Sequence, residues 1–108
     1  MGNGVEFRIS SLGQRVESTR ASLPFATAEA GDVVVRCPAG QDADINQMLV
    51  RISGLLKGEH RRLRKLKADG ARLECICTVT GGQLVLEPIA LEFLHLVGVA
   101  LVVRRVGA

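Results

Sequence analysis

Two groups of side chains near the middle of the sequence have the types and spacing to do chemistry. Residues 57 to 67 hold six of the chain's fourteen lysines and arginines, together with His60. Such a cluster could neutralise the phosphates of a nucleic acid and give salt-sensitive binding with little sequence preference. Cys75 and Cys77 follow two residues apart, and on a strand this spacing places both sulfurs on one face. The two groups raise the hypotheses of a nucleic-acid site and a metal or thiol site.

An amphipathic helix is the simpler explanation of the basic group. Leu63 and Leu66 would face inward from a helix over 59–69, which leaves the cations to solvent. An RNA-binding sheet also needs aromatic side chains, and the chain has no Trp or Tyr, while its three Phe lie outside the strands expected to present such a surface, 33–36 and 84–86. Nucleic-acid binding is therefore the less favoured function. If it occurs, we expect it to use Arg61, Arg62, Arg64 and Lys65.

The cysteines and histidines do not form a recognisable catalytic or metal motif. Cys37 adds a third thiol, but a structural zinc site needs four ligands, so small buried thiols are the favoured interpretation. Thiol catalysis needs a histidine oriented by a carboxylate, whereas His60 lies among cations and His95 follows Glu92 on a helix face expected to be exposed. No phosphate-binding loop or paired-carboxylate motif occurs. We predict a non-enzymatic protein without catalytic residues, metal or cofactor.

Length and composition predict a single domain in the cytoplasm. The chain has 108 residues, is 47% hydrophobic and carries a net charge of +3. It has no apolar stretch of membrane-spanning length and no export signal at its start. The lack of an export signal also favours reduced thiols over disulfides.

Hydrophobic periodicity predicts strands and helices in alternation. A β-branched run at 32–36 is typical of a strand buried on both faces, and the stripe that begins at Ile45 predicts the main helix. Gly70 and Gly98 stand where helices should end. The expected elements are strands at 5–9, 32–36, 71–79, 84–86 and 99–106, helices at 45–56, 59–69 and 88–97, and a loop over most of 10–31, where a short helix near 14–22 is an alternative.

The order of these elements predicts an α+β fold. From residue 32 to residue 106 they follow the βαββαβ order of ferredoxin-like domains, with residues 1–31 adding an N-terminal strand and loop.

The C-terminal half also resembles the bacterial domain of unknown function 4279 family. The resemblance covers residues 45–103 and includes the "LKADG" helix end and the run "LEPIALEFLHLVGVALVV". The family has no established activity, so the resemblance implies the fold and nothing about chemistry. The residues that carry it are Leu49, Ile52, Leu55, Leu63, Leu66, Gly70, Leu86, Leu91, Leu94 and Gly98.

The C-terminal region is the expected partner surface. Leu91 falls outside the apolar arc of its predicted helix, which has Ile89, Leu94 and Leu96 facing inward, and the last strand is apolar on both faces. Such surfaces in ferredoxin-like sheets favour association through faces or edges. We therefore expect a protein-interaction module that forms a homodimer through Leu91, His95 and Val103, unless the N-terminal strand or the loop at 10–32 covers this surface.

Overall fold

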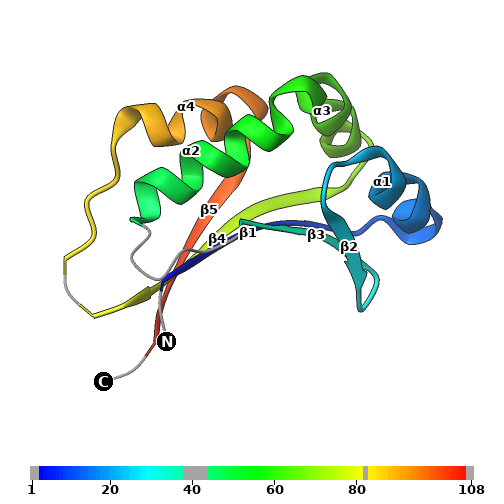
Figure 1. The fold of residues 1–108 in the computed structure, drawn as a ribbon. Coiled ribbons are helices and arrows are strands. Elements are labelled where there is room, and N and C mark those ends of the chain that lie inside the picture. The colour runs from blue at the N-terminus through cyan, green and yellow to red at the C-terminus, as the bar shows by residue number, and fades with distance from the viewer. Residues whose placement is uncertain (1–2, 38–43, 82, 107–108) are drawn as a thin grey trace.

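The computed structural model describes residues 3–37, 44–81 and 83–106, which form one sheet with helices over one of its faces (Figure 1). Short 3-10 turns at 13–15 and 57–59 lead into two of the helices. In chain order the elements are β1 (Gly4–Ser10), α1 (Val16–Ser22), β2 (Ala26–Glu29), β3 (Asp32–Arg36), α2 (Ile45–Leu56), α3 (His60–Ala68), β4 (Arg72–Thr80), α4 (Pro88–Val97) and β5 (Ala100–Val106).

The sheet has the strand order β2-β3-β1-β4-β5. All neighbouring strands are antiparallel except β4 and β5, which are parallel and joined by α4. The order β2-β3-β1-β4, with α1 between β1 and β2 and α2 between β3 and β4, is a ferredoxin-like arrangement. The predicted α+β class is confirmed.

The boundaries predicted for the βαββαβ unit need correction. The unit runs from β1 to β4, residues 4–80, instead of 32–106. The additional strand is β5 at the C-terminal edge, whereas the N-terminal strand β1 lies in the centre of the sheet.

The predicted strand at 84–86 does not form because this segment is held elsewhere. Asn46, in the first turn of α2, donates from Nδ2 to the Val85 carbonyl oxygen at 2.7 Å, and its Oδ1 accepts from the Glu87 backbone N–H at 2.8 Å. The segment therefore follows α2 instead of returning along β4.

β2 forms within a stretch that was predicted to be a loop. Glu29 and Asp32 are directly paired, so Ala30 and Gly31 make a two-residue hairpin loop. Both residues have positive φ, +53° and +84°, as type I′ turns require. Alanine rarely adopts this conformation, so a turn at this position could not be predicted from the residue types.

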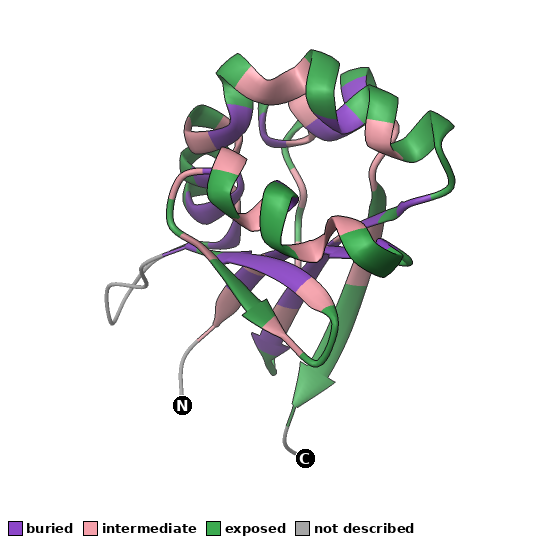
Figure 2. Cartoon of the chain, turned by 90° about the vertical axis from the view of Figure 1, so that its right-hand side faces the viewer, coloured by how far each residue is buried: buried purple, intermediate pink, exposed green. Residues whose placement is uncertain are grey.

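The core lies between the sheet and the helices. Val5, Phe7 and Ile9 alternate along β1 toward the helices, and β3 and β4 add further buried residues (Figure 2). The predicted inward stripe of α2 is confirmed, as is the inward position of Leu63 in α3. The buried residues of α2 are Ile45, Met48, Leu49, Ile52 and Leu56.

Candidate interaction surface

The strand β5 forms an exposed edge of the sheet. It pairs only with β4 and is exposed along most of its seven residues (Figure 2). Val103 is 42% exposed and Val106 38% exposed, although both belong to a strand. Unpaired backbone N–H and C=O groups on such an edge can accept another strand.

The helix α4 lies beside this edge with its sides clearly distinguished. Ala90, Leu94 and Val97 recur at helical spacing and are buried against the core. The same spacing puts Leu91 and His95 on the flank turned away from α2. Since α2 packs over β1, two strands away from β5, this flank faces the β5 edge.

The structure brings the three predicted partner residues to one side of the molecule, but they are not equally accessible. His95 and Val103 are exposed. Leu91 is half-buried and packs against the core, so its expected place outside the apolar arc is wrong. The reason is that α4 is rotated, which turns Leu91 inward and leaves Ile89 and Leu96 exposed.

This rotation creates a second apolar surface that the sequence did not predict. Val50 of α2 is 46% exposed, and on α4 Ile89 is 73% exposed and Leu96 55% exposed. They border a shallow groove of about 330 Å³ between the two helices. The groove is lined by Val50, Ser53, Gly54, Lys57, Ile89, Glu92, Phe93 and Leu96.

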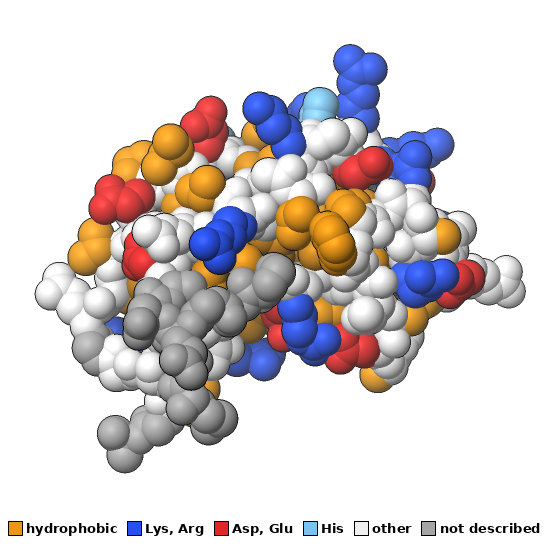
Figure 3. Space-filling model, viewed as in Figure 1, with side chains coloured by type: hydrophobic (Ala, Val, Ile, Leu, Met, Phe, Trp, Pro, Cys, Tyr) orange, Lys and Arg blue, Asp and Glu red, His pale blue; other side chains and the backbone are white. Residues whose placement is uncertain are grey.

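The basic group forms the outer side of α3, where its cations gather at one end of the helical layer (Figure 3). Arg61, Arg62, Arg64 and Lys65 are exposed, as the amphipathic interpretation predicts. Arg62 lies 3.3 Å from the Glu59 carboxylate. Lys67 donates from Nζ to the Gly98 carbonyl oxygen at 2.5 Å and thereby caps the end of α4. Part of the basic group is therefore structural.

The three cysteines are buried and none of them forms a disulfide, and Cys37 lies apart from Cys75 and Cys77. Cys75 and Cys77 point from β4 toward the helices, and a hydrogen bond with Cys77, together with burial, raises the pKa of Cys75. Cys37 follows β3, where burial also raises its pKa. Val5 lies between Cys37 and Cys77 across the sheet, since its carbonyl accepts from the Cys37 N–H and it pairs with Cys77. Two strand spacings, roughly 10 Å, separate these thiols.

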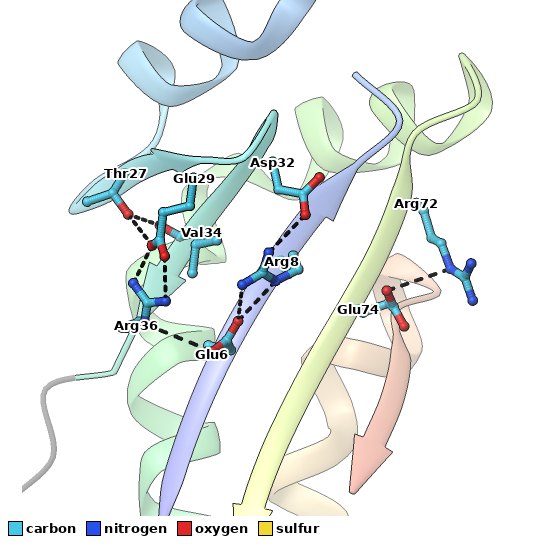
Figure 4. A network of polar contacts seen from close by, with 9 residues as sticks. All are labelled: Glu6, Arg8, Thr27, Glu29, Asp32, Val34, Arg36, Arg72 and Glu74. Carbon is cyan, nitrogen blue, oxygen red and sulfur yellow. Dashed lines mark hydrogen bonds and ion pairs between the residues drawn. The ribbon is translucent and has the colours of Figure 1, made fainter. Parts of the chain in front are cut away.

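The face of the sheet opposite the helices carries an ion-pair network (Figure 4). Arg8 binds Asp32 at 2.8 Å and Glu6 at 3.0 Å, and Arg36 pairs with Glu29. Val34 lies directly opposite Arg8, so the arginine stem can cover it, and Val34 is fully buried. A network of this kind was not predicted.

The described strands present no aromatic ring on this open face. Phe7 belongs to the central strand β1, but its ring is fully buried on the side of the helices. Phe25 precedes β2, and Phe93 belongs to α4. Base stacking on the sheet, the usual mode of RNA-binding ferredoxin-like domains, has no platform within residues 3–37, 44–81 and 83–106.

The described part of the chain offers neither a metal-binding cluster nor a membrane span. No three His, Cys, Asp or Glu side chains lie together there as metal ligands. Among the same residues, no helix has both the length and the apolar character that crossing a membrane requires.

Comparison with known proteins gives one partial similarity. The chain is 39% identical over 71 residues to the small ribosomal subunit protein uS11 of Methylibium petroleiphilum. The match covers 66% of this chain and 52% of that protein, so the chain spans about half the length of the relative that it matches. No family model and no solved structure matches the chain.

Proposed function

We propose that this chain is a small non-enzymatic module of the cytoplasm that acts by protein association, and that it associates with itself. The observation that carries the proposal is the exposed edge of β5, with Val103 and Val106 on it and the flank of α4 above it. An edge strand of seven residues is a ready surface for strand addition.

The proposal predicts a molar mass that rises with concentration. Light scattering from low micromolar to near-millimolar protein should show a shift from monomer toward dimer. The substitution Val103→Asp should raise the concentration at which the dimer forms at least tenfold, because a carboxylate would be desolvated in the contact. Val85→Asp changes another exposed valine, in the segment held against Asn46 of α2, and should leave the mass unchanged. A monomer throughout the range would contradict the proposed self-association.

A second candidate function is weak, sequence-independent binding of nucleic acid by α3. Arg61, Arg64 and Lys65 lie three and four residues apart, which places them on one exposed side of the helix. The partial similarity to a small ribosomal subunit protein also favours this candidate. Such binding would depend on phosphate neutralisation and would weaken steeply with salt.

A gel-shift assay at low salt tests this candidate with a generic duplex and a generic single-stranded RNA. The double variant Arg61→Glu/Arg64→Glu should weaken any retardation at least tenfold, because two phosphate contacts become repulsive. Arg72→Glu reverses one exposed charge at the start of β4, outside the helix α3, so it serves as the control. Absence of retardation of the native chain would exclude this function.

A further inference from the structure

We propose that the partner at β5 is a second copy of the chain, paired antiparallel with Val103 on the two-fold axis, so that the two sheets become one. The inference rests on the proposed self-association and adds its geometry. It is drawn from the two edges of the sheet, the charges along β5 and the side on which the helices lie.

The two edges of the sheet are unequal. β2 has four residues, and the neighbouring α1 packs against it. β5 has seven residues and is largely exposed. A longer edge offers more backbone hydrogen bonds to an incoming strand, so β5 is the edge suited to pairing.

The side of the helices limits the possible registers. Leu101 and Val103 face the helices, whereas Val102 and Arg104 face the open side, as their pairing with β4 shows. Directly opposite residues in an antiparallel pair point to the same face. When both copies keep their helices on the same side, a residue that points toward the helices must lie opposite another residue that points toward the helices. Such a pairing requires the two-fold axis to pass through a residue position and not between two residues.

One register uses the whole strand and places no two arginines directly opposite each other, although the two Arg104 side chains become diagonal neighbours across the axis. With Val103 on the axis, all seven residues from Ala100 to Val106 are paired. Arg104 then lies opposite Val102 of the partner subunit, and Arg105 lies opposite Leu101 of the partner subunit. A shift of the axis to Arg104 would place two arginines face to face, which is destabilising. A shift to Val102 would leave the end of the strand unpaired.

This arrangement also uses the flank of α4. The two-fold axis brings the flanks that carry Leu91 and His95 toward each other above the joined β5 strands. Leu91 is only half-buried in the single chain, so the second copy would cover its remaining surface. The same association therefore joins sheet edge and helix flank.

Disulfide trapping tests the register directly. Opposite residues in an antiparallel pair have Cα atoms about 4.5 to 5.5 Å apart, within the range of a disulfide. The native thiols Cys37, Cys75 and Cys77 are buried and should not compete. Under mild oxidation Val103→Cys should form a covalent dimer at least tenfold faster than Val85→Cys, whose exposed position lies in the segment held against α2.

A mixed experiment gives a second measure of the same register. Val102→Cys and Arg104→Cys should cross-link to each other when the two variants are mixed, and faster than either cross-links to itself. Preferential trapping at these positions supports the inference.

The outcomes separate the geometry from the function. A concentration-dependent dimer in which Val103→Cys is trapped no faster than Val85→Cys would overturn this register and leave the proposed self-association standing. A native chain that stays monomeric by light scattering would overturn the self-association itself.

Discussion

The ion pairs on the open face of the sheet show how single charged side chains can cover a face that has no layer of described helices. The segment 32–36 was predicted to be buried on both faces, and Val33, Val34 and Val35 are indeed fully buried. For Val34 the cover comes from charged side chains on neighbouring strands, since all the described helices lie on the other face. The partners Arg8 and Asp32 are 24 residues apart, so their contact could be foreseen only with the strand register known.

Glu29 is the member of this network with the clearest pH dependence. Arg36 holds the pKa of Glu29 at about 2, below its ordinary value, and Thr27 adds a hydrogen bond in the same direction. Above its ordinary pKa the carboxylate is charged in both states and its pairing stabilises the fold. As the pH falls from about 4.5 to about 2, the unfolded state gains the proton first, so this stabilisation is lost.

We therefore expect acid to lower the melting temperature less in Glu29→Gln than in the native chain. The difference should develop between about pH 4.5 and pH 2 and can be followed by circular dichroism. Glu92→Gln removes an exposed carboxylate from α4 and serves as the control. Equal acid sensitivity of Glu29→Gln and the native chain would contradict the role of this pair.

At the scale of elements, α4 shows what hydrophobic periodicity cannot predict, which is the rotation of a helix that is apolar on nearly all sides. Nearly every position of the helix is apolar, so the pattern fixes its existence and leaves its rotation open. In the structure Ala90, Leu94 and Val97 pack against the core, and this rotation of the helix leaves Ile89 and Leu96 exposed. The helix α2, with a clear polar face, was predicted correctly because only one rotation buries its stripe.

Two glycines in this layer should respond oppositely to alanine. Gly54 lies within α2, and a Cβ there would meet open space, so Gly54→Ala should raise the free energy of unfolding by about 1 kcal/mol. Gly98 ends α4 at φ +80°, so Gly98→Ala should lower it by about 1 kcal/mol through backbone strain. Urea denaturation measures both. The same sign for both variants would show that these backbone conformations do not decide the effect.

At the scale of the whole molecule, the sequence contained a genuine ambiguity. The order βαββαβ can be traced from β1 to β4, or from β3 to β5 if 84–86 is a strand. Both tracings have similar hydrophobic patterns. The first requires the turn at Ala30 and Gly31, which carries no typical signature, and the second is prevented by the hydrogen bonds of Asn46. The class of fold was therefore predictable, whereas the residues at which the βαββαβ unit begins and ends were not.

The buried thiols report on opening of the whole fold. Cys75 and Cys77 have no exposed surface, and the hydrogen bond with Cys77 together with burial raises the pKa of Cys75, so reaction with an alkylating reagent requires the core to open. We expect alkylation of the native chain to be much slower than that of an unfolded thiol, and to accelerate with urea in parallel with unfolding. Mass spectrometry after pulsed labelling measures this. Fast labelling in native buffer would contradict a closed core.

The central position of β1 has a consequence for synthesis of the chain. Val5 needs Cys77 as its neighbour on one side, and Phe7 needs Val35 on the other. A nascent polypeptide can therefore form the β1–β3 ladder early, but the other side of its first strand stays open until β4 has left the ribosome. Closure of both sides of β1 is tied to the emergence of residue 80, and loss of the first ten residues would remove the middle of the sheet and not a dispensable end.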